Sequence, residues 1–308
     1  MLRQTTLARP VTGRGIGVHS GVPVRLTIRP AQAGTGVVFV RTDLDDRPCV
    51  PAQAAFVVDT RLATTLGNGP TRVSTVEHLL AALAGVGIDN AVVEVDAPEV
   101  PIMDGSALPW VKLLTAAGRT ELDAPRPVLV VDRPITLRDG AREITVEPAD
   151  RFAVHYEIAF EHAAVPAQSL SLTVDARTFA EELAPARTFG FLSEIEALKA
   201  RGLGRGGSLE NAVVIGTDRI LNPEGLRFPD EFVRHKALDL VGDLALLGMP
   251  LRGRVAVTRG GHALHTRLVA ALLADESAWH LEGVPEAPRR QRERARRPLV
   301  AQPAAVLG

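Results

Sequence analysis

One segment of the sequence places a histidine and two carboxylates at a helical spacing. In VRHKALDLVGD (233–243), His235 and Asp239 are four residues apart, and Asp243 follows one turn later. On a helix, side chains at this spacing project from one face. An imidazole and a carboxylate on one face can bind a divalent metal ion, but a plain surface His–Asp pair has the same pattern.

A second cluster, Glu77-His78, lies directly before the apolar run LLAALAG. In a functional interpretation His78 is a third metal ligand and Glu77 is a base directed at water on the metal. Two histidines and one carboxylate leave one position of tetrahedral zinc open, as a hydrolytic site requires. In the structural alternative Ser74 caps a helix, Glu77 completes the capping box, and His78 is merely tolerated.

The third candidate is His262 in TRGGHALH (258–265). Gly260 and Gly261 allow the backbone to leave a strand and to present His262 at its end; a solvated loop histidine is the alternative. The glycine-rich segments 12–17 and 202–207 do not fit nucleotide-binding loops. The first lies too close to the start for a preceding βαβ strand, and the second leads into a strand-like segment.

The elements that must position these residues are strands and helices in two similar runs. Period-two alternation and apolar runs predict strands at 21–31, 35–41, 47–58, 90–95, 154–160, 169–174 and 253–259, with a hairpin over 135–150. Helices are predicted at 178–184, at 229–247 and from Ser74 onward, where Gly85 and Gly87 end the helical pattern. Segments 82–95 and 245–258 share a helix-end, turn and strand layout, which favours a duplication. We therefore predict an α+β protein of two similar domains, 1–125 and 126–284, divided near a Pro-rich stretch.

Composition narrows the function classes. The 308 residues are 46% hydrophobic and 23% charged with a net charge of −1, so no global field attracts nucleic acid or an anionic membrane. The single cysteine, Cys49, fits a reducing compartment. No apolar run reaches the length of a membrane span, and the first residues lack a signal-peptide core. These features predict a cytoplasmic monomer with at most peripheral membrane contact, ending in a basic, disordered tail at 285–308.

Seven segments, in order, resemble one family: GIGVHSG (15–21), STVEHLLAALAG (74–85), MDGSA (103–107), ARTFGF (186–191), RGGSLENAVV (205–214), VRHKALDLVGDL (233–244) and GHAL (261–264). The sequence resembles the UDP-3-O-acyl-N-acetylglucosamine deacetylases, zinc amidases of lipid A biosynthesis, from about residue 3 to about residue 275. The resemblance implies two α+β domains, each a sheet layer packed on helices, with the active site in the cleft between the helical layers.

The resemblance also implies roles for ten residues and one zinc ion per chain. The zinc ligands would be His78, His235 and Asp239, and Fe²⁺ could replace the zinc. In the reaction, Glu77 would be the general base, His262 the general acid and Thr188 the oxyanion partner, while Asp243 would hold His262 in its working protonation state. The UDP-sugar substrate would be contacted by Lys236, Phe189 and His19. Amide hydrolysis needs an activated water and a proton for the departing amine, and these groups supply both.

The substrate carries a long acyl chain, for which an apolar groove is expected in the insertion near 191–214. Its candidate lining residues, for which ordinary helix packing is the alternative, are Phe191, Leu192, Ile195, Leu198 and Leu203. Lys236 is one of only three lysines, and an ammonium suits a single oxygen or phosphate. A zinc amidohydrolase with another acyl-amide substrate is the second hypothesis. A non-catalytic binding protein is disfavoured, because a closed structural zinc site would use a fourth ligand, usually cysteine, and Cys49 lies in no metal-spaced pair.

Overall fold

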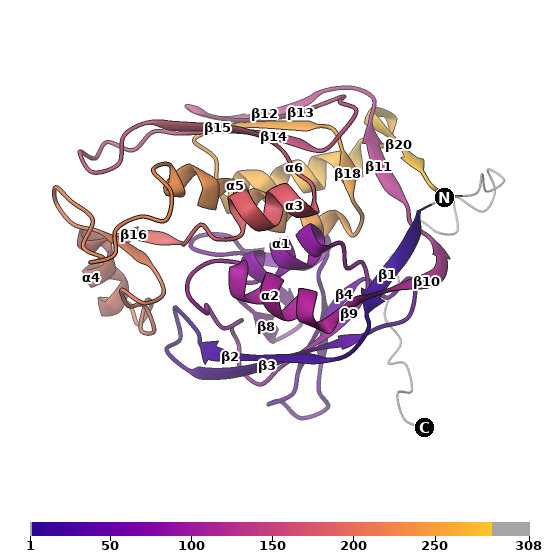
Figure 1. Cartoon of the computed structure of the whole chain (residues 1–308), viewed down its shortest axis with the longest axis horizontal. Coiled ribbons are helices and arrows are strands. Elements are labelled where there is room, and N and C mark those ends of the chain that lie inside the picture. Colours follow the sequence, from indigo (N-terminus) through magenta and orange to yellow (C-terminus); the bar gives the residue numbers. More distant parts are fainter. Residues whose placement is uncertain (1, 285–308) are drawn as a thin grey trace.

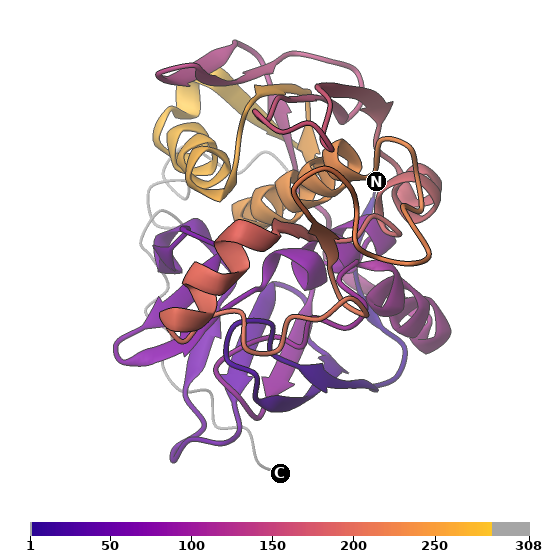
Figure 2. The ribbon, with the colours of Figure 1, turned by 90° about the vertical axis from the view of Figure 1, so that its left-hand side faces the viewer.

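The computed structural model describes residues 2–284, so the tail predicted at 285–308 lies outside the described residues. Two five-stranded sheets form the outer layers, and the helices lie between them (Figure 1). The view from the side in Figure 2 shows the same order of layers. The predicted class, α+β with two similar halves, is confirmed. The limits of the two domains remain a prediction.

The first sheet is formed by residues 11–95. Its spatial order is β2 (Val11–Ile16), β3 (Pro23–Pro30), β9 (Ala91–Val95), β4 (Val37–Arg41) and β5 (Cys49–Pro51). Neighbours pair antiparallel except β9 and β4, which are parallel. Val24, Leu26 and Ile28 alternate with exposed residues along β3, so one face of the sheet is buried against the helices.

The second sheet repeats this arrangement. Its spatial order is β12 (Ile135–Asp139), β13 (Arg142–Glu147), β19 (Arg254–Thr258), β14 (Ala153–Ile158) and β15 (Gln168–Thr173). Again the third and fourth strands, β19 and β14, form the parallel pair. The same order and directions in both sheets support the duplication inferred from the sequence.

The remaining strands form smaller sheets. They are β1 (Arg3–Leu7) paired with β10 (Arg119–Pro125); β11 (Val128–Val131) between β18 (Leu251–Arg252) and β20 (Trp279–Glu282); β6 (Val57–Asp59), β7 (Thr65–Asn68) and β8 (Thr71–Val73) in one small sheet; and β16 (Phe189–Phe191) with β17 (Val213–Ile215). The predicted division of the chain near residue 125 falls between β10 and β11.

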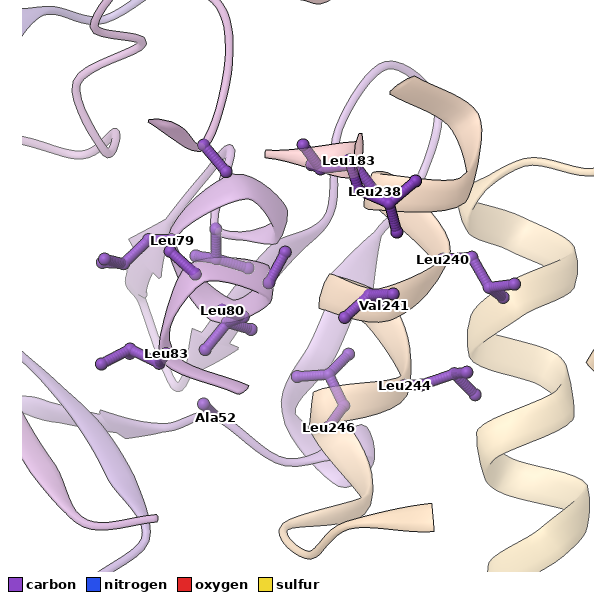
Figure 3. Packing of buried hydrophobic residues seen from close by; sticks show 14 of the residues in the cluster. Ala52, Leu79, Leu80, Leu83, Leu183, Leu238, Leu240, Val241, Leu244 and Leu246 are labelled. Carbon is purple, nitrogen blue, oxygen red and sulfur yellow. The ribbon is translucent and has the colours of Figure 1, made fainter. Parts of the chain in front are cut away.

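The α-helices are α1 (Glu77–Val86), α2 (Leu108–Ala117), α3 (Ala176–Thr178), α4 (Leu192–Ala200), α5 (Glu231–Leu244) and α6 (His262–Ala274). A π-helical turn (Phe179–Leu183) follows α3, and 3-10 turns lie at Ala54–Phe56, Ala245–Leu247 and Glu276–Ala278. The sequence reading did not predict α2 or α6. Figure 3 shows the core between α1 and α5, with Leu240 and Leu244 of α5 directed at α6.

α1 and α5 meet at Gly242. A Cβ on this residue would lie 2.1 Å from the carbonyl oxygen of Glu77. Only glycine allows the two backbones to approach so closely, and the consequence is that the first turn of α1 lies directly against the last turn of α5.

The predicted capping box at the start of α1 is wrong. The helix begins at Glu77, and Val76 is its N-cap residue, without a side-chain capping bond. Ser74 instead lies in extended backbone, where its N–H donates to the Pro98 carbonyl and its own carbonyl accepts from the Val100 N–H. The Glu77 carboxylate is therefore not used to cap the helix and is available elsewhere.

None of the helices between residues 2 and 284 has the length and hydropathy needed to cross a lipid bilayer.

Candidate metal-dependent active site

Three potential metal ligands converge where α1 meets α5. His78 lies in the first turn of α1, and His235 and Asp239 lie one turn apart on α5. The Nε2 atoms of His78 and His235 are 3.6 and 3.4 Å from Oδ1 of Asp239. All three side chains are at least 95% buried. The helical spacing in the sequence and the contact between the two helices thus produce one compact group.

The polar atoms of this group fit a divalent cation. Oδ1 of Asp239 is buried and has no hydrogen-bond partner among the described residues. His235 donates from Nδ1 to the Ala186 carbonyl at 3.1 Å. Its Nε2 therefore carries a lone pair, which faces Oδ1 of Asp239. Burial lowers the pKa of His235 to about 3, so its ring is neutral. A buried anionic oxygen facing a nitrogen lone pair is unfavourable unless a cation lies between them.

A neighbouring group, Asp243 with His262 and His265, is also close enough to hold an ion. Its atoms are already paired, however. The Nδ1 atoms of the two histidines lie 2.8 and 2.9 Å from Oδ2 of Asp243, at hydrogen-bond distance. Because none of these atoms lacks a partner among the described residues, protons alone satisfy this group, and it does not call for a metal.

Glu77 lies beside the potential ligands in α1 and is almost fully buried. Its Oε2 accepts a hydrogen bond of 3.0 Å from the backbone N–H of Thr64. Burial raises the pKa of Glu77. A carboxylate whose pKa is closer to neutrality is a more effective proton acceptor in catalysis.

His262 is the first residue of α6, and its Nε2 lies 3.9 Å from Oδ2 of Asp239. Burial by itself lowers the pKa of His262. The charge of Asp243 and its hydrogen bond raise this pKa by more than burial lowers it, to about 9. The ring is therefore protonated at neutral pH. A protonated imidazole beside the ligand group would be a proton donor, and its Nδ1 lies 3.3 Å from the Thr64 hydroxyl.

Thr64 connects these two side chains, and the sequence analysis missed it. Its hydroxyl donates to Oδ1 of Asp243 at 2.5 Å, while its N–H donates to Glu77. Thr64 comes from the segment before β7, and nothing in the Thr-Thr pair between Ala63 and Leu66 marks it as functional. Only the fold places it between the two candidate proton-transfer groups.

Lys236 and Phe189 lie at the edge of the ligand group. The Lys236 ammonium donates to Oδ2 of Asp239 at 2.7 Å and lies 5.5 Å from the centre of the Phe189 ring. The Phe189 ring is in turn 6.2 Å from the His235 ring. The lysine charge thus helps to keep Asp239 ionised, since Lys236 is among the charges that hold the pKa of Asp239 well below its usual range against the effect of burial.

The backbone of Thr188 is held in place by the MDGSA segment. Its N–H donates to the Gly105 carbonyl at 2.7 Å. Gly105 has a φ of +87°, and a Cβ there would lie 2.2 Å from the Asn211 carbonyl oxygen, so glycine is needed for this approach. The Thr188 hydroxyl makes no hydrogen bond to the ligand group within residues 2–284.

His19 is fixed by a carboxylate that the sequence analysis did not single out. Glu99 accepts from the N–H groups of His19 and Ser20 at 2.9 and 2.8 Å. The same loop accepts at the His19 carbonyl from the N–H of Arg205, so it contacts the insertion of the second half. The His19 ring, half-buried, has no hydrogen bond at Nδ1 in the described part of the chain.

Two observations concern the predicted acyl groove. α4 carries no buried residue: Leu192 is 42% exposed, and Ile195 and Leu198 are half-buried. A cavity of about 310 Å³ lies elsewhere, between the C-terminal ends of α1 and α5, and none of the ligand residues lines it. The acyl groove expected in the insertion near 191–214 thus stays a prediction.

Comparison with known proteins places the chain in a family. Residues 4–274 match the family described as LpxC, UDP-3-O-acyl N-acetylglycosamine deacetylase. A protein of Myxococcus xanthus (strain DK1622) named UDP-3-O-acyl-N-acetylglucosamine deacetylase is 51% identical over 290 residues, which cover 94% of this chain and 91% of the relative. A protein of the same name from Phenylobacterium zucineum (strain HLK1) is 53% identical over 282 residues, covering 90% of this chain and 96% of the relative. This chain belongs to the UDP-3-O-acyl N-acetylglycosamine deacetylase family.

Proposed function

We propose that this chain hydrolyses the N-acetyl amide of UDP-3-O-(3-hydroxyacyl)-N-acetylglucosamine and releases acetate, the committed step of lipid A biosynthesis. The names of relatives with about half of their residues identical support the substrate. The observation that carries the chemistry is the unpartnered, buried Oδ1 of Asp239 between two imidazole Nε2 atoms.

We propose that His78, His235 and Asp239 hold one zinc ion per chain. Two nitrogen ligands and one carboxylate are a common catalytic set for zinc, and the same set suits Fe²⁺. When bound, such an ion lowers the pKa of water towards about 7 and polarises a carbonyl group. Oδ2 of Asp239 accepts a hydrogen bond from the Lys236 ammonium, and this bond orients the carboxylate as a ligand.

Proton transfer is assigned to two residues of the chain. The Glu77 carboxylate accepts the proton of the attacking water, and the His262 imidazolium gives its Nε2 proton to the amine nitrogen as the C–N bond breaks. Asp243 accepts from His262 Nδ1 and thereby keeps that nitrogen protonated. The Thr188 hydroxyl donates to the oxygen of the acetyl group as negative charge develops there.

Substrate contacts are assigned to the rim of this group, between the two helical layers. Lys236 would meet an oxygen of the sugar nucleotide, Phe189 and His19 would contact the sugar, and the apolar side chains of 191–214 would line the acyl groove. We place the enzyme in the cytoplasm as a monomer, in keeping with its single cysteine.

Acetate release tests this function. Purified protein is assayed with UDP-3-O-(3-hydroxyacyl)-N-acetylglucosamine as isolated, after removal of metal by a chelator, and after addition of one equivalent of Zn²⁺. We expect acetate release to be lost after the chelator treatment and to return when Zn²⁺ is added. Folded, zinc-loaded protein that releases no acetate from this substrate, but cleaves another acyl amide, would contradict the assignment and favour an altered substrate.

A further inference from the structure

Two buried titratable residues take no part in the proposed chemistry. His265 lies in α6 one turn after His262, and Tyr156 lies in β14; both are fully buried. Nδ1 of His265 is 2.9 Å from Oδ2 of Asp243, and its Nε2 is 3.0 Å from the Tyr156 hydroxyl. A histidine and a tyrosine with this burial need partners: Tyr156 and His265 are partners of each other, and His265 is also a partner of Asp243.

The proton positions in this chain of groups follow from the chemistry of each. Burial raises the pKa of Asp243, but the two histidines lower it by more than burial raises it. The carboxylate is therefore ionised and can only accept hydrogen bonds. Both Nδ1 atoms must therefore donate to it. Burial lowers the pKa of His265, so its ring is neutral and Nε2 is an acceptor. Burial also raises the pKa of Tyr156, which keeps the proton that it donates to Nε2.

The sequence keeps space for this contact. A Cβ on Gly260 would lie 2.8 Å from the Tyr156 hydroxyl and 3.2 Å from Nε2 of His265. It would also lie 2.3 Å from a methyl group of Val257. The absence of a side chain at Gly260 thus allows β19 to turn into α6 directly over the hydrogen bond between the tyrosine and the histidine.

We propose that His265 and Tyr156 are positioning residues for the general acid His262. They act through Asp243: two donors on Oδ2 and the Thr64 hydroxyl on Oδ1 fix the carboxylate in one orientation. A carboxylate fixed in this way holds His262 with Nδ1–H toward Asp243 and Nε2 toward Asp239. This inference rests on the function proposed above, and it adds two residues to the proton-transfer apparatus that touch neither metal nor substrate.

The test uses the full-length zinc-loaded protein and three variants of graded severity. His265→Ala removes both hydrogen bonds, His265→Asn retains a donor near the position of Nδ1, and Tyr156→Phe removes only the hydroxyl. Side-chain ¹⁵N and ¹H NMR of the histidines reports the protonation state of His262 and whether its Nδ1–H is held in a hydrogen bond. Steady-state kinetics and bound zinc are measured on the same samples.

We expect His265→Ala to lower kcat about 10- to 100-fold, the usual effect of losing an outer hydrogen bond to a site residue. KM and bound zinc should stay near the wild-type values, and the Nδ1–H signal of His262 should shift or broaden. His265→Asn should recover most of kcat and the signal. Tyr156→Phe should leave the His262 signal in place, move that of His265, and reduce kcat only a few-fold.

Two results would overturn the inference. One is a His262 signal and kcat that are unchanged in folded His265→Ala. The other is an equal loss of activity and zinc in His265→Ala and His265→Asn, which would make the role structural. If His265→Ala does not fold, the Asn and Phe variants decide by the same signals. The NMR readout needs no substrate, so wild-type protein that releases no acetate would contradict the proposed function without deciding this inference.

Discussion

Gly242→Ala is the substitution that most directly tests how the fold makes the site. The new methyl carbon would lie 2.1 Å from the Glu77 carbonyl oxygen and 3.0 Å from the Glu77 Cα. A normal C···O contact is about 3.3 Å, so the two helices must separate by roughly 1 Å. The neighbouring atoms are backbone, which cannot rotate away. The helices that separate are the ones that carry His78 and Asp239.

The expected magnitudes follow from this displacement. Overpacking costs about 1–3 kcal/mol, and the higher helix propensity of alanine offsets up to about 1 kcal/mol, so we expect a net loss of roughly 1–2 kcal/mol in the free energy of unfolding. A misplacement of about 1 Å in a catalytic site costs on the order of 100-fold in rate. We therefore expect a modest loss of stability together with a large loss of kcat/KM and weaker zinc binding.

Ala245→Gly is a control substitution of the same two residue types, at the C-cap of α5 three residues after Gly242. It removes a methyl group without adding an atom between the helices. Both variants are compared with wild type by thermal unfolding, by zinc competition with a chelator and by acetate release. Normal zinc affinity and kcat/KM in folded Gly242→Ala would refute the link between helix contact and site geometry.

Three further results are expected. Glu77→Ala should keep zinc and lose most turnover, whereas His78→Ala should lose both; equal zinc content in the two variants, measured by metal analysis, would contradict the division of roles. Asp243→Asn removes the charge that raises the pKa of His262 to about 9, so the loss of kcat/KM with rising pH should begin at lower pH; a pH–rate profile with an unmoved basic limb would exclude His262 as the titrating acid. Thr64→Val should lower kcat about 10-fold while zinc content and KM stay near normal, and unchanged kinetics would show that the Thr64 hydroxyl does not orient Asp243.

Much of the site could be predicted from local sequence. His235, Asp239 and Asp243 lie on one face of a helix wherever that helix is placed, because the helical repeat brings residues four apart to the same side. The alternation in residues 21–31 predicted a half-buried strand, and the structure has it at Pro23–Pro30. The similar layout of 82–95 and 245–258 also predicted two related halves, which the matching sheet orders support.

Other local patterns misled, since long-range contacts decided their outcome. Ser74 and Glu77 have the spacing of a capping box, yet Ser74 pairs with the segment around residue 99, and Glu77 accepts from Thr64. His262 follows two glycines, which left a solvated loop possible; instead it begins a helix and is buried against Asp243. In each case the competing partner is distant in the sequence, so no local rule could select it.

The sequence by itself determined which residue types can bind a metal and exchange protons, and on which short elements they lie. Only the tertiary structure decided that His78 reaches Asp239, because that contact depends on two helices from different halves meeting at Gly242. The same packing brought Thr64, Tyr156 and His265 around Asp243. The physical reason is range: periodicity fixes the direction of a side chain relative to its own helix, whereas burial, hydrogen-bond partners and pKa depend on which distant elements pack around it.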